Sequence, residues 1–226
     1  MNIRRGSWAP ARWGIVIALM LTVASGLAYP GGTVRDESTR AYSFTHNFLS
    51  DLGGTVAFNY QRNVLGAVLF GVSVLIGVLV LAGSIVAAVR LLSATPPARS
   101  FARLAAVAGV LVCAGFLGVA LTPLDRAWRL HLLSSMVAFR SFPVVTALLA
   151  IATARDARFR PRATVGWVTL TIVLAGCIAM ALLGPSLDTE HGLVTHVVTQ
   201  KIMAISVLVV LWVESREAEV ATVAHS

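Results

Sequence analysis

The chain has 226 residues, of which 57% are hydrophobic and 12% are charged, with a formal net charge of +8 and a mean hydropathy of +0.82. A soluble domain typically has about a quarter of its residues charged, so this composition excludes an ordinary soluble protein. No nucleic-acid-binding motif accompanies the positive charge, which we attribute to arginines at a membrane surface. We therefore predict an integral membrane protein with lipids as partners and no nucleic-acid partner.

The apolar residues fall into six blocks, most of them near the ~20 residues that a helix needs to cross a bilayer. The blocks cover residues 13–29, 64–89, 101–122, 130–153, 164–183 and 192–212. They must be helical, because hydrocarbon offers no partner to the hydrogen-bonding groups of an open backbone. The sequence predicts an all-α fold, with residues 1–226 forming one bundle of six transmembrane helices.

The arginines predict how this bundle is oriented. A cytoplasmic N-terminus places eleven arginines, among them Arg4 and Arg5, on inner segments and five on outer segments. By the positive-inside rule, both termini are expected in the cytoplasm of a multi-pass cell-membrane protein. The longest connection, residues 30–63, is then an outer loop.

The outer loop contains the run "YSFTHNFLSDLGGT", residues 42–55, which is polar in an otherwise apolar chain. We predict an amphipathic α-helix over about 43–53, ended by a left-handed cap at Gly53-Gly54. Its apolar face would carry Phe44, Phe48, Leu49 and Leu52, and its polar face His46, Asn47, Ser50 and Asp51. Two orientations remain open: the helix lies flat at the membrane surface, or it folds over a cavity with its polar face inward.

Four of the five histidines are expected near the outer face, and only His225 lies in the C-terminal tail. Histidines with a carboxylate suit zinc, so His131, His191 and His196 are candidate ligands, with His46 as a further one. However, the chain has no HExxH or HxxxH, and His191 and His196 are about 140° apart on a regular helix. Proton transfer, or a place at the level of the lipid head groups, is the alternative.

Two cations are expected deep in the bilayer, because Arg140 and Lys201 each lie about ten residues inside a span. A charge at that depth costs at least ~2.5–3.5 kcal/mol, and neither span has a carboxylate at matching depth. Asp51 is the nearest candidate partner if the loop folds inward. The alternatives are an ion pair or carbonyl contact for Arg140, and snorkelling for Lys201.

The run "THNFLSDLGGT", the segment "NVLGAVLFGVSVLIG" after it and the six-span layout resemble a known family. It is the bacterial and archaeal integral-membrane family catalogued as domain of unknown function 998. The resemblance marks Asn47, Ser50, Asp51, Leu52 and Gly53 as its motif, and it implies six helices but no particular activity.

A fainter likeness is to the membrane hydrolases of the alkaline ceramidase and adiponectin-receptor group, which hold zinc with a Ser, an Asp and three histidines. Ser50, Asp51, His131, His191 and His196 are the matching residue types here. The number of spans differs, and the last helix has HxxxxH where that group has HxxxH.

These features favour an enzyme, a hydrolase or transferase for a lipid or lipid-linked substrate that enters from the outer leaflet. Asp51, Ser50 and His46 are the candidate catalytic residues. An anionic head group would bind Arg140, Lys201, Asn47 and Gln200. The alternatives are a small transporter or receptor for an anionic or proton-coupled ligand, and a non-catalytic helper subunit in which Arg140 or Lys201 pairs with another chain.

Overall fold

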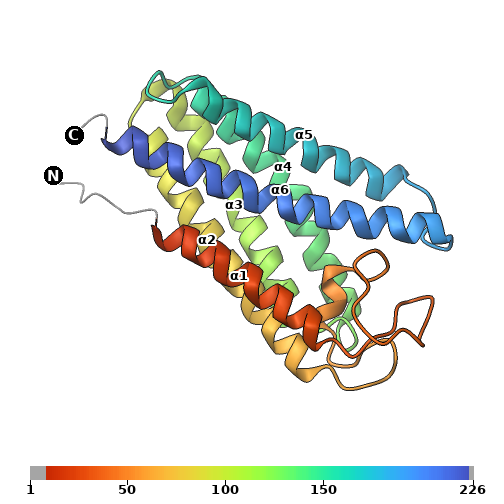
Figure 1. The fold of residues 1–226 in the computed structure, drawn as a ribbon. Helices are drawn as coiled ribbons and strands as arrows, with labels where there is room; N and C mark the ends of the chain where they lie inside the picture. The colour runs from red at the N-terminus through yellow and green to blue at the C-terminus, as the bar shows by residue number, and fades with distance from the viewer. Residues whose placement is uncertain (1–8, 224–226) are drawn as a thin grey trace.

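The structure, a computed structural model, describes residues 9–223, with side chains described as far as Arg216. Arg4, Arg5 and His225 lie outside this part. The described chain forms six α-helices: α1 Ala9–Ala28, α2 Val64–Leu92, α3 Pro96–Leu121, α4 Trp128–Ala154, α5 Pro161–Leu183 and α6 Glu190–Val223 (Figure 1). All six are long and apolar enough to cross a membrane, so the predicted all-α, multi-pass architecture is confirmed.

All six helices are longer than their predicted spans, and for three of them the reason is visible in the sequence. α3 and α5 each begin at a proline, Pro96 and Pro161, in the first turn, where the missing N–H would have had no partner anyway. α6 continues to Val223, beyond the predicted end at 212, because the charged residues after Trp212 are good helix formers. Apolarity thus marks the membrane boundary rather than the end of the helix.

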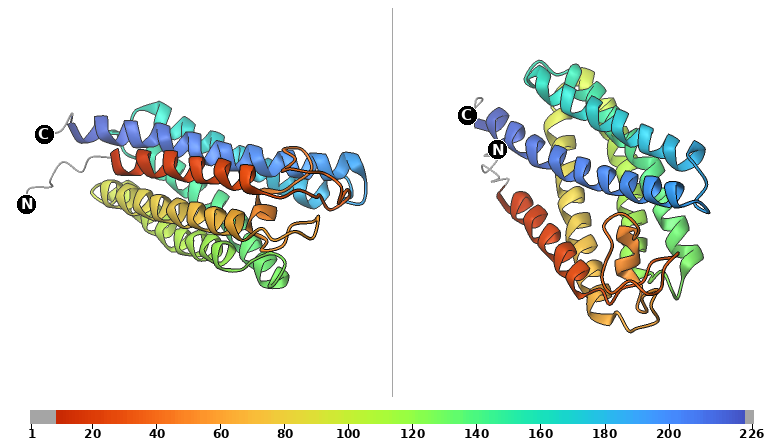
Figure 2. Two further views of the ribbon diagram at one scale, coloured as in Figure 1. Left: turned by 60° about the horizontal axis from the view of Figure 1, so that its bottom comes forward. Right: turned by 45° about the vertical axis from the view of Figure 1, so that its right-hand side comes forward.

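The helices run up and down and pack mainly against their neighbours in sequence. The loop 30–63 and the α3–α4 and α5–α6 connections therefore meet at one end of the bundle, which we call the loop end, and the termini lie at the other (Figure 1). α1 and α6 diverge from the terminal end toward the loop end, and the loop folds back into the resulting wedge (Figure 2). The bundle therefore opens toward the end that carries the polar loop.

Small residues allow the closest helix contact, between α3 and α4. A Cβ added at Gly115 would lie 2.6 Å from the Ala138 backbone nitrogen and 2.7 Å from the Ser134 carbonyl oxygen. Only glycine permits this approach, which fixes the register of the two helices. Phe142 and Leu149 of α4 then complete the apolar core.

The outer loop contains a short helix, as predicted, but the α-helical conformation and the bounds 43–53 are wrong. Residues 44–46 form a turn, Asn47 lies in a bend, and a 3₁₀ helix, η1, covers Leu49–Gly53. Gly54 has a φ of −71°, so no left-handed cap ends it. The side chains of Asn47 and Asp51 bind the backbone N–H groups of Ser43 and Phe48, and such local bonds compete with α-helical ones.

Candidate functional site

Asn47 is the centre of the folded loop and is fully buried. Its Nδ2 donates to the Gly32 carbonyl at 3.0 Å and to Asp51 Oδ2 at 3.2 Å, while its Oδ1 accepts from the Ser43 N–H at 2.9 Å. One amide side chain thus ties three parts of the loop together. Asn47 was predicted to bind substrate, but its side chain holds the loop in shape.

Asp51 has a similar role in the turn that leads into η1. It is 6% exposed, and its Oδ2 accepts from the Phe48 N–H at 2.8 Å as well as from Asn47. Burial raises the pKa of Asp51 to about 6, although the bonds from Asn47 and Phe48 and the charge of Lys201 lower it. Asp51 and Lys201 both bind Asn47, but no ion pair joins these two side chains among the described residues.

Lys201 is the buried cation of the bundle, 3% exposed in the loop half of α6. Its Nζ donates to the Asn47 backbone oxygen at 2.6 Å, which also accepts from the Tyr42 hydroxyl at 3.1 Å. Nζ lies 5.4 Å from the ring centre of Tyr42 and 5.0 Å from that of Phe44. A carbonyl and two aromatic faces attract the charge without neutralising it.

Gln200 makes the second bond between α6 and the loop. Its Oε1 accepts from the Leu49 N–H at 2.7 Å, at the first residue of η1. Gln200 thus holds η1 against α6, and Lys201 holds the turn before it at Asn47. At the opposite side of the loop, Thr55 donates through its N–H and its hydroxyl to Asp125, each at 2.7 Å. The loop is therefore attached to α6 and to the α3–α4 connection, as a fixed cover.

Beneath this cover lies a cavity of about 610 Å³. Its walls come from α1, α2, α3, α4 and α6, and Ser50, Gln200 and Lys201 are polar residues at its loop end. Toward the terminal end the lining is apolar, with Ile15, Leu81, Leu208 and Leu211. The volume lies within the range of ~300–1,000 Å³ usual for ligand sites, and the lining is apolar with a few polar groups, as in such sites.

The cavity reaches the surface that the bundle presents to lipid. Leu27 of α1, Phe44 of the loop and Ile205 of α6 all line it, and they are 85%, 62% and 54% exposed. Leu27 and Ile205 belong to α1 and α6, the two helices that diverge toward the loop end (Figure 2). The cavity is thus open on the side where α1 and α6 diverge.

Arg140 does not belong to this site. Ser135, Phe139 and Phe142 of α4 face the cavity at i, i+4 and i+7, and Arg140 is turned about 100° from Phe139. Its side chain is exposed on the outside of the bundle. The predicted pairing of Arg140 with Lys201 around one head group is wrong, because Lys201 lines the cavity while Arg140 is on the outside of α4.

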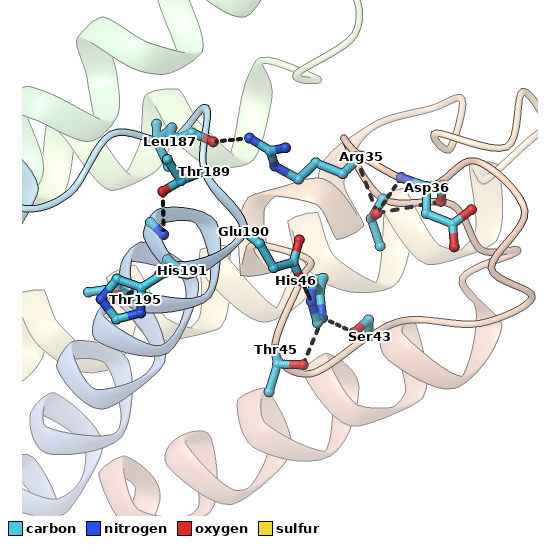
Figure 3. A network of polar contacts seen from close by, with 12 residues as sticks. Arg35, Asp36, Ser43, Thr45, His46, Leu187, Thr189, Glu190, His191 and Thr195 are labelled. Carbon is cyan, nitrogen blue, oxygen red and sulfur yellow. Dashed lines mark hydrogen bonds and ion pairs between the residues drawn. The ribbon is translucent and has the colours of Figure 1, made fainter.

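His46 lies on the outside of the loop, against the start of α6 (Figure 3). Its Nε2 contacts Glu190 Oε1 at 2.5 Å, and its Nδ1 is 2.8 Å from the Thr45 hydroxyl. Close by, Arg35 donates to the Leu187 carbonyl at 3.1 Å. These contacts attach the loop to the α5–α6 connection. Of the three predicted catalytic residues, only Ser50 lines the cavity, whereas His46 and Asp51 hold the cover.

The other three histidines are all at the loop end, as predicted, but in separate surroundings. His131 is buried, with Nδ1 donating to the Thr122 carbonyl at 2.7 Å and Nε2 unpaired among the described residues. His196 Nε2 donates to the Pro185 carbonyl at 2.9 Å, and His191 is exposed on the first turn of α6. Within residues 9–216, no three His, Cys, Asp or Glu side chains could hold a metal ion, so the predicted zinc site is not formed.

The sequence analysis missed Tyr42 and Phe44 as neighbours of Lys201. Both aromatic residues lie at the start of the polar run 42–55, and the signal available for them was that a buried lysine can be stabilised by aromatic rings.

No family model, no curated protein and no solved structure matches this chain. The two family resemblances drawn from its residues stay predictions.

Proposed function

We propose that the protein binds an anionic lipid, or a lipid-linked molecule, with its acyl chain in the cavity and its head group at Lys201. The observation that carries this proposal is Lys201, the one Lys or Arg that is buried among the described residues, at the polar end of an otherwise apolar cavity. The Nζ of Lys201 has a carbonyl and two rings as neighbours and forms no ion pair with Asp51 or any other described carboxylate, so it can still attract an anion. Gln200 and Ser50 add polar groups beside it.

The apolar lining at the terminal end supports an acyl chain rather than an ion path. Ile15, Leu81 and Leu211 offer neither charge nor hydrogen bonds. An ion or proton route would need polar groups continuing to the other end of the bundle. The transporter alternative therefore has less support than a lipid site. On the predicted topology, the lipid enters from the outer leaflet.

Photo-crosslinking tests this proposal directly. The purified protein is placed in nanodiscs with phosphatidylglycerol or phosphatidylcholine, each carrying a diazirine on one acyl chain, and the labelled peptides are identified by mass spectrometry. The proposal expects labels on cavity residues such as Val74 and Phe139, and stronger labelling by the anionic lipid. Equal labelling of all lipid-facing helices, without preference for head group, would contradict it.

A hydrolase or transferase acting on the same lipid is the second candidate. It is favoured by Ser50, whose side chain lines the cavity beside Gln200 and Lys201. The test is product formation from a defined phosphatidylglycerol, followed by mass spectrometry, in the wild-type protein and in Ser50→Ala. If Ser50 is catalytic, Ser50→Ala loses turnover but keeps the crosslinking of lipid to the cavity.

A further inference from the structure

Arg140 stands at the middle of α4, twelve residues after Trp128 and fourteen before Ala154. At 1.5 Å per residue it is therefore about 18 and 21 Å from the two ends of the helix. The hydrocarbon core extends only about 15 Å to either side of its centre, and an arginine at the centre is too short to reach the head groups on either side. With α4 centred on the bilayer, this guanidinium lies in the least polar layer of the membrane.

The side chain also points away from the bundle. Arg140 is exposed, and Leu133, Met136 and Val144, spaced three or four residues apart around it, are exposed on the same face of α4. We call these four residues the Arg140 face. No hydrogen bond, ion pair or ring contact joins Arg140 to another of the described residues. In the single chain, the charge would therefore face lipid, which is rare for arginine.

The chain cannot neutralise Arg140 from a second copy of itself. The only carboxylates on the six helices are near the ends of α6, at Glu190 and from Glu214 onward. None is close to mid-span, so a symmetric dimer through the Arg140 face would bring two arginines together. The missing partner must supply a negative charge at the centre of the bilayer.

We propose that the Arg140 face binds a transmembrane helix of another protein, one that carries an Asp or Glu near the middle of its span. The apolar residues around Arg140 would pack against this helix, and the guanidinium would form a desolvated pair with its carboxylate. Such a pair fixes both the depth and the rotation of the partner helix. This surface is separate from the cavity and does not depend on the lipid proposal.

Site-specific photo-crosslinking in native membranes tests the partner. A benzoylphenylalanine is placed at Met136 or Val144, on either side of Arg140, and at the exposed Val86 of α2 as a matched control. The proposal expects one protein adduct shared by positions 136 and 144 and missing at 86, with a mid-span acidic residue in the captured protein. Arg140→Leu should abolish the adduct, Arg140→Lys should retain most of it, and exchanging the two charges between the partners should restore it.

A second measurement separates partner binding from a role inside this chain. For the purified protein alone in nanodiscs, Arg140→Leu removes an unfavourable charge, and its Tm should rise by about 5 °C. A fall in Tm would overturn the proposal, because Arg140 would then stabilise its own bundle. Adducts formed only with lipid, only with a second copy, not at all, or equally in Arg140→Leu would overturn it too.

Discussion

Lys201 donates from Nζ to the backbone oxygen of Asn47 at 2.6 Å, across 154 residues of sequence. This bond brings the only lysine of the chain to the floor of the folded loop and to the polar end of the cavity. The same contact that closes the cover thus places a positive charge where a lipid head group would lie.

Lys201→Met should remove the preference for an anionic head group. Methionine keeps most of the stem but not the charge, and a charge-assisted contact is worth about 1.5–3 kcal/mol, or roughly tenfold to a hundredfold in affinity. We expect phosphatidylglycerol labelling to fall to the level of phosphatidylcholine. Lys201→Arg, which keeps the charge, is the control, and a preference that survives in Lys201→Met would exclude this role.

Asn47→Ala should weaken the cover. The substitution removes the donors to Gly32 and Asp51 and the acceptor for Ser43 in a fully buried place. Leaving these buried groups unpaired should lower the free energy of unfolding by about 2–4 kcal/mol. Limited proteolysis of residues 30–63 in nanodiscs measures the opening, with Ser38→Ala on the exposed part of the loop as control. Unchanged proteolysis would show that Asn47 does not organise the loop.

Asp51 should make the docked loop more stable in acid. Its pKa is raised to about 6 in the folded protein, above its ordinary value of 3.8, so the folded state binds the proton more tightly. The stabilisation is complete below pH 3.8 and is lost as the pH rises through about 6, by up to about 3 kcal/mol. Asp51→Asn does not titrate, so the Tm of the wild type should fall relative to the Tm of the variant as the pH rises from acidic to neutral. A constant difference would show that Asp51 does not titrate in this range.

The contact of His46 with Glu190 should matter little. Both side chains are partly exposed, at 32% and 65%, and a surface pair of this kind contributes about 0.2–1 kcal/mol. His46→Ala should therefore lower stability only slightly and leave lipid labelling unchanged. A double-mutant cycle with Glu190→Ala measures the coupling. Loss of labelling or of any lipid turnover in His46→Ala would instead support the catalytic role predicted from the sequence.

The positions of the helices could be predicted because an apolar segment of about 20 residues can pair all its backbone N–H and C=O groups inside a membrane only as a helix. The inward fold of the loop was one of two predicted orientations, and buried Asn47 and Asp51 decide it. The α-helical conformation predicted for 43–53 was wrong, because hydrophobic periodicity contains no information about the hydrogen bonds that Asn47 and Asp51 accept from nearby backbone N–H groups.

The grouping of polar residues was harder to predict. A shared end of the bundle does not mean a shared site, as His46, His131 and His196 show by binding separate carbonyl or carboxylate partners. Similar depth does not mean a shared direction either, since Lys201 points inward and Arg140 outward. The cavity itself gave no signal, because its lining is the same apolar sequence that crosses the membrane.

Filling the cavity tests the central claim most directly. Gly77 and Gly83 lie on α2, and a Cβ at either would meet no atom within 4 Å, but only Gly77 lines the cavity. Both are replaced by Phe, and crosslinking of diazirine-phosphatidylglycerol to Phe139 is measured in nanodiscs. A lipid in the cavity predicts that Gly77→Phe lowers labelling at least about tenfold while Gly83→Phe leaves it unchanged, because only the first ring occupies the site of the acyl chain. Equal labelling in the two variants would contradict the lipid site.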